Sequence, residues 1–275
     1  MIKITNLDFS YKKTKVFKNI NLDFERGNIY GLLGENGVGK TTLLKLICGL
    51  QRPDCGSCTV DSHTPSDRKP DFLGNIYFLP ESVITPDTTP ETFTARTGVF
   101  YPRFDMEFFR QLTTEMEIDP KRKFATLSYG QQKKALIAMA ISLKTDYLLL
   151  DEPTNGLDIP SKALFRQIVA RHCTDDTTII ISTHQVKDVE KLIDPIVILD
   201  HDDVLLKASV NEITSRICFE YGTERIANAL YTELLPGGYL NVTVNTEGVE
   251  SQVNIEGLFN AVLKNKKTIK EIFKK

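Results

Sequence analysis

Residues 34 to 41 are Gly34-Glu35-Asn36-Gly37-Val38-Gly39-Lys40-Thr41. Two glycines five positions apart, followed by Lys and Thr, match the phosphate-loop pattern. The glycines let successive backbone N–H groups turn toward one centre and approach an anion closely. An apolar run precedes the loop at residues 29–33, and the apolar spacing after it, at residues 43–47, suits a buried helix face. The order is therefore strand, loop and helix, and we expect the loop to bind phosphate.

The chemistry of this loop suits a nucleoside triphosphate and its metal ion. Lys40 would reach the β and γ phosphate oxygens, and the following helix would add its positive N-terminal end. The hydroxyl of Thr41 would ligate Mg²⁺, an ion that keeps phosphate oxygens and waters among its ligands. The residues of this segment that we expect to bind the cofactor ATP are Gly34, Asn36, Gly37, Gly39, Lys40, Thr41 and Thr42.

A pair of carboxylates follows a second apolar strand. Leu148, Leu149 and Leu150 run directly into Asp151 and Glu152. Open α/β sheets bind ligands at the carboxyl ends of their strands, so we expect both carboxylates beside the phosphate loop. Asp151 would hold Mg²⁺, directly or through water, and Glu152 would accept the proton of an attacking water. Without the phosphate loop, such a strand end is as often a solvated turn.

Composition and charge exclude several classes of protein. The 275 residues are 41% hydrophobic and 25% charged, close to a soluble globular protein and far from disordered, collagen-like or coiled-coil chains. A formal charge of -2 gives no whole-chain footprint for nucleic acid, so we expect no nucleic acid partner. The apolar run at residues 135–143 is shorter than the roughly 18 to 20 residues that span hydrocarbon. Since the start, MIKITNLDFS, is not a secretory signal, we expect a cytoplasmic chain that does not itself cross a membrane.

The apolar pattern along the chain predicts an α/β fold. Two antiparallel strands are expected within residues 2–24, where apolar residues mostly alternate with polar ones. Residues 85–143 carry helical patterns and predict a helical subdomain. Further strands are expected at 76–79, 147–150, 178–182 and 196–199, with a helix after Pro160. This alternation implies a phosphate-loop NTPase with a mainly parallel sheet that is covered on both faces.

The pattern changes from about Asp203. Short strands are predicted at 204–206, 218–221 and 239–244, with helices between them. Ser209, with Glu212 three residues later, predicts a capping box at the start of one of these helices. We therefore expect one domain over residues 1–210 and a small C-terminal α+β appendage over residues 211–275.

The order of these motifs resembles the ATP-binding cassette (ABC) family over roughly residues 1 to 210. Leu127-Ser128-Tyr129-Gly130-Gln131 is similar to the family's signature sequence, and there is room for one helix before the strand that carries Asp151. Asn155-Gly156-Leu157-Asp158 resembles the loop after the catalytic strand. The resemblance further implies that His184 is the switch histidine and that Tyr11 stacks on adenine.

The resemblance implies a head-to-tail pair of cassettes, either two copies of this chain or this chain with a different cassette. Ser128, Gly130 and Gln131 of one subunit would then cover the γ-phosphate bound at Lys40 of the other. Glu152, His184 and Lys40 would be the catalytic residues. The resemblance also implies a separate integral membrane permease subunit, with the cassette peripheral at the inner face of the cell membrane. The expected function is the ATPase subunit of a membrane transporter, an exporter, and the alternative is a soluble ABC ATPase such as an iron–sulfur cluster assembly component.

Two positions depart from the family's pattern. Tyr129 stands where the signature usually has a glycine that lets the backbone approach the nucleotide. Glu81 follows the strand at 76–79, where the family usually places a glutamine. A carboxylate at this place could still reach Mg²⁺ as an oxygen ligand, so the expected metal ligands are Thr41, Asp151 and Glu81.

The five cysteines are an odd and thinly spread set, so we expect reduced thiols. Cys55-Gly56-Ser57-Cys58, with Cys48 and His63 nearby, admits a zinc or redox site. The same location also resembles the family's turn before a strand, here residues 53–56, and this resemblance favours a structural turn.

Overall fold

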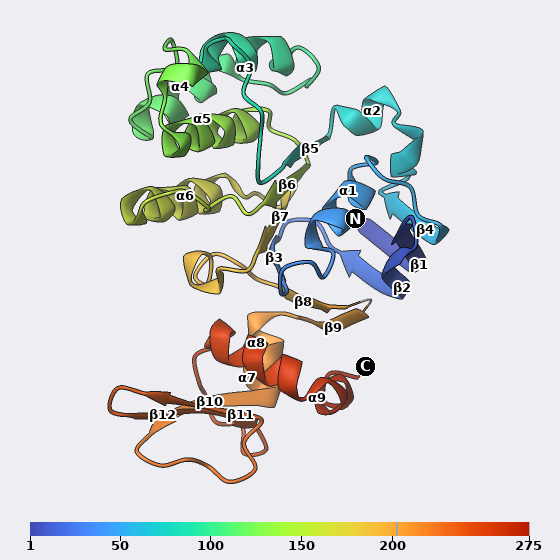
Figure 1. Ribbon diagram of the computed structural model, residues 1–275, viewed down its shortest axis with the longest axis vertical. Helices are drawn as coiled ribbons and strands as arrows, with labels where there is room; N and C mark the ends of the chain where they lie inside the picture. Colours follow the sequence, from blue (N-terminus) through green and yellow to red (C-terminus); the bar gives the residue numbers. More distant parts are fainter. Residues whose placement is uncertain (202, 275) are drawn as a thin grey trace.

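The computed structural model describes residues 1–201 and 203–274. Three parts follow one another along the long axis of the molecule: a helical part, a central part with two sheets, and a C-terminal part (Figure 1). The α/β fold expected from the sequence is confirmed. Within the described ranges, no helix has both the length and the apolar character needed to cross a membrane.

The centre of the molecule is a six-stranded sheet. Neighbouring strands in it are parallel except for the last pair, so the expectation of a mainly parallel sheet is confirmed. In spatial order its strands are β5 (Ile76–Leu79), β6 (Tyr147–Asp151), β7 (Thr178–Thr183), β3 (Ile29–Leu33), β8 (Ile196–Asp200) and β9 (Asp203–Ala208). The four strands β6, β7, β3 and β8 are buried along their whole length, which explains their nearly continuous apolar sequences.

Two apolar cores lie on opposite faces of this sheet, because successive side chains of a strand point to opposite faces. Leu148 and Leu150 belong to one core, together with residues of α5 (Tyr129–Ser142) and α6 (Ile159–His172). Leu149 belongs to the other core, together with residues of α1 (Lys40–Ile47). The sheet is therefore covered on both faces, as the sequence predicted.

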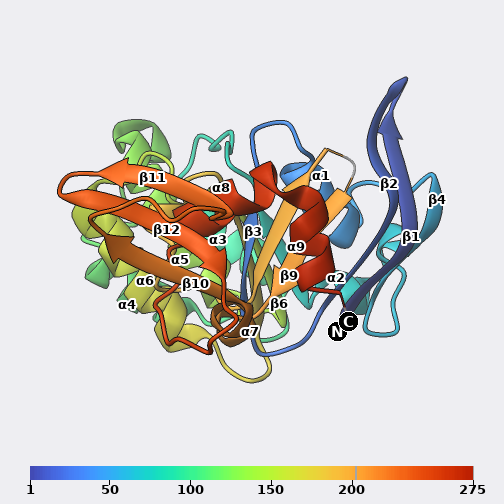
Figure 2. The ribbon, with the colours of Figure 1, turned by 90° about the horizontal axis from the view of Figure 1, so that it is seen from below.

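A second, antiparallel sheet stands beside the first (Figures 1 and 2). In it, β1 (Ile2–Tyr11) lies between β2 (Thr14–Phe24) and β4 (Cys55–Val60). Ile2 is paired with Phe24, so the two N-terminal strands form the antiparallel pair expected from their sequence. This sheet covers the core that contains α1.

The geometry of strand β4 bears on whether Cys55 and Cys58 form a zinc or redox site or a structural turn. Cys58 is buried, and burial raises the pKa of its thiol to about 12, whereas Cys55 is exposed. The two residues are three positions apart on one strand, so their side chains leave opposite faces. Gly56 has φ 75°, and a Cβ there would collide with the backbone of Asn6. The segment is a structural turn entering a strand.

The helical part (residues 85–143) contains α3 (Pro90–Gly98), α4 (Met106–Glu115) and α5. Each of these helices is preceded by a residue whose side chain accepts a hydrogen bond from a backbone N–H of the first turn: Thr89, Asp105 and Ser128. A shorter 3-10 turn in the helical part is η2 (Phe124–Thr126), and further short segments outside it are α2 (Pro70–Leu73) and the 3-10 turns η1 (Pro65–Asp67) and η3 (Val186–Asp188).

The C-terminal part (residues 210–274) is an α+β unit. Its antiparallel sheet has the order β10 (Ile217–Gly222), β12 (Gly238–Val244) and β11 (Tyr231–Leu235). Its helices are α7 (Val210–Arg216), α8 (Ile255–Lys264) and α9 (Lys266–Ile272). Strand β11 was not predicted; its residues are at most half-buried, so they carry a weak apolar alternation. The predicted capping box is half formed, because Ser209 caps the helix but the carboxylate of Glu212 pairs with Arg216, at 3.2 Å.

The C-terminal part packs directly on the central part. Leu258 of α8 and Ile213 of α7 belong to the same buried apolar cluster as Val189. Strand β9, which the sequence placed in the changed pattern after Asp203, is the edge strand of the central sheet. A domain boundary near residue 210 stays a prediction.

Candidate active site

The carboxyl ends of β3, β6 and β7 meet at one edge of the central sheet. The register pairs Leu33 with Thr183 and Asp151 with Ser182, so the residues that follow these strands lie together. A pocket of about 530 Å³ opens at this edge, a volume typical of small-ligand sites. Its lining residues are Tyr11, Thr14, Val16, Asn36, Gly37, Gly39, Lys40, Thr41, Thr42, Glu81, Asp151, Glu152 and His184.

The structure thus brings together most of the residues that the sequence singled out, but not all of them. Gly34 does not line the pocket, and a Cβ on it would lie 2.7 Å from the Val38 side chain. Ser128, Gly130 and Gln131 lie at the start of α5 and do not line the pocket. Ser128 and Gln131 are joined in a complete capping box, so they also start a helix.

Lys40 is buried at the base of the pocket. Its Nζ donates hydrogen bonds to the carbonyl oxygens of Gly34, at 2.7 Å, and Glu35, at 3.1 Å. Burial lowers the pKa of Lys40, while three nearby carboxylates, Glu152 most strongly, act to raise it. The ammonium is therefore held over the loop by neutral acceptors that phosphate oxygens can replace.

A hydroxyl and a carboxylate lie side by side next to Lys40. Thr41 Oγ1 donates to Asp151 Oδ2 at 2.7 Å, and the hydroxyl of Ser182 donates to the other oxygen of Asp151. Glu81 lines the same pocket, and its Oε1 accepts a hydrogen bond from the amide of Asn155 at 2.8 Å. Hydroxyl and carboxylate oxygens are the ligands that Mg²⁺ prefers, so this donor set fits the ion.

Glu152 is held by three hydrogen-bond donors. The backbone N–H and the ring Nδ1 of His184 lie 3.0 and 2.7 Å from Glu152 Oε1, and the Thr183 hydroxyl lies 3.0 Å from Oε2. Because an ionised carboxylate can only accept, Nδ1 carries a proton in this arrangement. Glu152 also has φ 45°, a left-handed conformation that is uncommon for residues with a side chain and is found at functional sites. The geometry fixes Glu152 and His184 as one unit.

Sequence reasoning missed several residues that support this unit. Ser182 and Thr183 end a fully buried strand, and their hydroxyls hold the two carboxylates. The signal was present, because buried hydroxyls after an apolar run need partners. Lys133 on α5 is 3% exposed, and its Nζ donates to the carbonyl oxygen of Glu81 at 2.7 Å. A lysine on an otherwise apolar helix face could have been recognised, because lysine is rarely fully buried without a partner.

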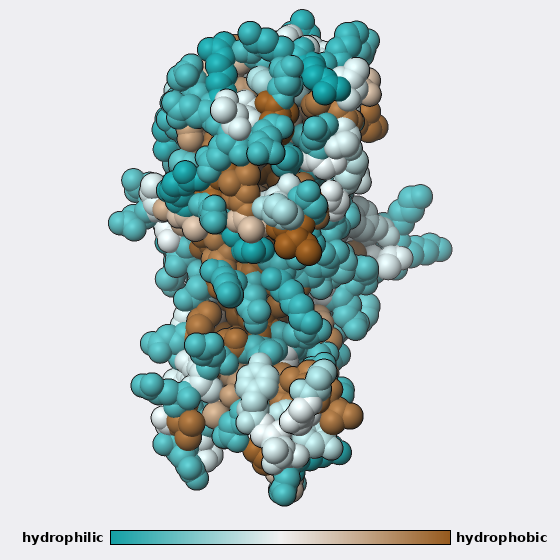
Figure 3. Space-filling view, turned by 90° about the vertical axis from the view of Figure 1, so that its left-hand side faces the viewer, coloured by the Kyte–Doolittle hydropathy of each residue, from teal (hydrophilic) through white to brown (hydrophobic). Residues whose placement is uncertain are grey.

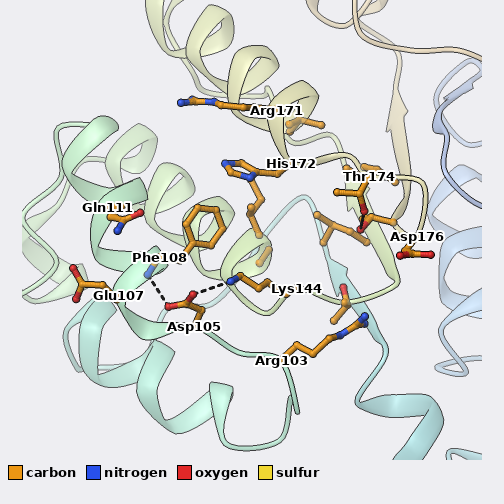
Figure 4. Close-up of a pocket in the computed structure, with 17 residues that line it drawn as sticks. Arg103, Asp105, Glu107, Phe108, Gln111, Lys144, Arg171, His172, Thr174 and Asp176 are labelled. Atoms are coloured by element: carbon orange, nitrogen blue, oxygen red, sulfur yellow. Dashed lines mark hydrogen bonds and ion pairs between the residues drawn. The ribbon is translucent and has the colours of Figure 1, made fainter.

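A second cavity, of about 560 Å³, lies away from the phosphate loop, between α4, α5 and α6 (Figure 4). Hydrophobic surface shows between hydrophilic groups on this side of the molecule (Figure 3). Three basic side chains at the cavity form ion pairs within the chain: Arg103 with Asp146, Lys144 with Asp105, and Arg171 with Glu115. This cavity lies where the helical part packs against α6, and no residue of the phosphate loop lines it.

The fold and the first pocket define a class of protein. A phosphate loop, a Thr41–Asp151 pair and a histidine-bound Glu152 meet at the carboxyl edge of a mainly parallel sheet, which is the arrangement of a phosphate-loop ATPase.

The chain belongs to the ABC transporter family, whose sequence profile matches residues 17–155. It is an ABC ATPase subunit that binds and hydrolyses ATP to power a transporter. It is 29% identical to the ABC transporter ATP-binding protein YtrB of Bacillus subtilis, over 78% of this chain and 73% of that protein. It is also 29% identical to the cobalt import ATP-binding protein CbiO of Salmonella typhi, over 78% of this chain and 82% of that protein. A dimeric bacterial ABC transporter cassette shares the fold, with a TM-score of 0.67 at 24% identity over 76% of this chain and 98% of that one.

Proposed function

We propose that this chain drives a membrane transporter through ATP hydrolysis at the pocket around Lys40, Asp151 and Glu152. The observation that supports this most directly is the convergence of Lys40, the Thr41–Asp151 pair and the Glu152–His184 pair in one pocket. The test is phosphate release from MgATP by the purified chain and its Lys40→Ala variant. Turnover that requires Lys40 supports the proposal, and a wild-type protein that releases no phosphate, alone or with its membrane subunit, contradicts it.

Different residues of the pocket are proposed to bind the phosphates, the Mg²⁺ ion and the adenine of ATP. Phosphate oxygens of ATP replace the carbonyl oxygens that Lys40 now binds, and the backbone N–H groups of the loop face the same anion. Thr41 and Asp151, with Glu81 beside them, would hold Mg²⁺, which neutralises phosphate charge when bound. Tyr11, at 41% exposure, lines the pocket on β1 and is proposed to stack on adenine.

Glu152 accepts the proton of the attacking water in this proposal. Its carboxylate is aimed by the two N–H groups of His184 and by the Thr183 hydroxyl, so it loses little freedom when water binds. The oxygen that the Thr183 hydroxyl contacts has one donor, while the oxygen at His184 has two. The less occupied Oε2 is the one that we assign to proton transfer.

A second cassette would complete the site. Ser128, Gly130 and Gln131 are outside their own pocket, at the N-terminal end of α5, where the positive end of the helix dipole favours an anion. In a head-to-tail pair, these residues would cover the γ-phosphate bound at Lys40 of the partner. The proposed assembly is a dimer of two copies of this chain or of this chain with another cassette.

The membrane subunit needs a surface on which to dock, and the structure offers an apolar groove. The groove has a volume of about 530 Å³ and lies between α2, β5 and the helical part. Leu50 and Phe100 line it and are 52% and 76% exposed, and the neighbouring Val99 is 76% exposed. Large apolar side chains gathered on a surface mark interaction sites. We propose that an apolar segment of the permease subunit occupies this groove and holds the chain at the inner face of the cell membrane.

The direction of transport is a separate question. The expectation of an exporter stays a prediction, since one of the relatives above is named as an import protein. The test is a transport assay with inside-out membrane vesicles and ATP added to the medium. The cytoplasmic face of such vesicles faces the medium, so accumulation of substrate inside them indicates export. If the protein hydrolyses ATP in cells and no membrane protein copurifies with it, the result would instead favour the alternative of a soluble ABC ATPase.

A further inference from the structure

The ring of Tyr129 packs against Gly156. Tyr129 is the first residue of α5 and is 55% exposed. Gly156 has φ 80°, and a Cβ built on it would lie 2.6 Å from Cδ1 of the Tyr129 ring. A Cβ on Gly130 would lie 3.1 Å from the carbonyl oxygen of Gly156. The start of α5 and the loop at residues 154–158 therefore fit closely, with glycine at both points of contact.

The residue before Gly156, Asn155, connects this contact to the pocket. Its Nδ2 donates to Glu81 Oε1 at 2.8 Å, and its Oδ1 accepts from Gln185 Nε2 at 3.0 Å. Glu81 lines the pocket, and Gln185 directly follows His184. A shift of the loop at Gly156 would therefore move Asn155, the hydrogen-bond partner of both Glu81 and Gln185.

Helix α5 reaches Glu81 by a second contact. Lys133, one turn after Tyr129, donates from Nζ to the carbonyl oxygen of Glu81 at 2.7 Å. Burial lowers the pKa of Lys133, while the carboxylate of Glu81 acts to raise it. The helix thus holds the backbone of Glu81 through Lys133 and the side chain of Glu81 through the loop that Tyr129 contacts.

We propose that Tyr129 is a positioning residue for ATP hydrolysis in its own subunit. Its ring holds the loop at residues 154–158 so that Asn155 keeps Glu81 and Gln185 in place beside the catalytic pair. The glycine usual at this position has no ring, so this link belongs to the present chain. The inference rests on the proposed head-to-tail dimer, in which the residues beside Tyr129 cover the partner's nucleotide. One side chain would then connect the two nucleotide sites of the dimer.

The first experiment compares Tyr129→Ala with Tyr129→Phe in steady-state ATP hydrolysis. Ala removes the ring, so kcat should fall about three- to twenty-fold while KM for ATP changes less than about two-fold. Phe keeps the ring, and the Tyr129 hydroxyl makes no hydrogen bond to the described residues, so this variant should match wild type. Because Tyr129 is more than half exposed, both variants should keep the wild-type Tm. If the Tyr129 ring only stabilised the fold, Tyr129→Ala would lower Tm and would not lower kcat selectively relative to KM for ATP.

The second experiment asks whether Tyr129 acts through the loop. Asn155→Ala should lower kcat as Tyr129→Ala does, and the double variant should be no slower than the slower single variant, because both changes release the same contacts. Multiplied effects in the double variant would show independent roles and would overturn the proposal.

The third experiment assigns the effect to a subunit. Mixed dimers are prepared from one active protomer and one Glu152→Gln protomer, which is expected to bind ATP without hydrolysing it. Tyr129→Ala should slow single-turnover phosphate release when it is in the active protomer and not when it is in the Glu152→Gln protomer. An effect only in the second arrangement, in both, or in neither would overturn the proposal. If wild type hydrolyses ATP and Tyr129→Ala equals it, this inference alone fails; if wild type itself is inactive, the proposed function fails and this inference fails with it.

Discussion

The ring Nδ1 of His184 lies 2.7 Å from Oε1 of Glu152, and the two residues follow neighbouring parallel strands. This pairing depends on the register of β6 and β7, because Asp151 is opposite Ser182 and Glu152 then meets Thr183 and His184. The segment that follows His184 also contacts the C-terminal part, where Lys187 pairs with Glu256 at 2.7 Å. The candidate base, the histidine and α8 are therefore mechanically connected.

Glu152→Gln should keep the shape of the pocket while removing the proton acceptor. We expect kcat to fall by about 100-fold or more, while ATP remains bound. Persistent ATP should stabilise the proposed dimer by linkage, which size-exclusion chromatography with light scattering measures with and without MgATP. Glu247→Gln, at an exposed carboxylate of the C-terminal part, is the matched control. Normal hydrolysis by the Glu152 variant would remove Glu152 from its assigned role.

Lys40→Ala should weaken ATP binding. The variant loses charge-assisted hydrogen bonds to phosphate, so Kd for ATP should rise about 10- to 100-fold. Fluorescence titration with a labelled ATP analogue measures the change. Lys191→Ala, which removes an exposed lysine elsewhere, should bind as wild type does. Equal affinity in the Lys40 variant would contradict the assignment of the loop.

Mg²⁺ should be required for turnover. Chelation with EDTA should abolish phosphate release, and added Mg²⁺ should restore it. Thr41→Ala removes one proposed oxygen ligand, so this variant should need a higher Mg²⁺ concentration for half-maximal rate. Asp151 is the second proposed ligand, and Asp151→Asn should shift the same titration further because it removes a charge. Superimposable Mg²⁺ titrations for all three proteins would show that these oxygens are not ligands.

Phe100→Asp should weaken association with the membrane subunit. A charge placed in the apolar groove cannot be buried against an apolar segment without a large desolvation cost. The measurement is the fraction of this chain that copurifies with membranes containing its integral subunit. Val249→Asp, at an apolar residue that is 44% exposed outside the groove, is the control and should copurify normally. Undiminished copurification of the Phe100 variant would place the docking surface elsewhere.

Leu258→Ala should destabilise the whole chain if the C-terminal part shares one core with the central part. Leu258 is fully buried, so the free energy of unfolding should fall by about 2–5 kcal/mol. Chemical denaturation followed by circular dichroism should still give one transition, at lower denaturant. Leu234→Ala, at a leucine that is 73% exposed, should change stability by less than about 0.5 kcal/mol. A separate early transition in the Leu258 variant would indicate that the C-terminal part unfolds independently.

Much of the fold was predictable because its signals are local. The buried strands at the centre are continuous apolar runs, and the caps at Ser128 and Ser209 act within one turn of a helix. Prediction failed where the local signal was weak. Strand β11 is half-exposed and alternates poorly, and the reciprocal contact expected of Glu212 was lost to Arg216, one turn away.

The sequence by itself predicted the phosphate loop and the carboxylates Asp151 and Glu152 at a strand end, because a tight loop and a strand end depend on near neighbours in the chain. The place of His184 came from the resemblance to the ABC family. The tertiary structure alone decided which distant side chains support them. Lys133 reaches Glu81 across 52 positions and Asn155 reaches Glu81 across 74. Tyr129 meets Gly156 only because α5 and the loop after β6 pack together. Such contacts follow from the packing of helices on a sheet, and no pattern along the chain encodes their partners.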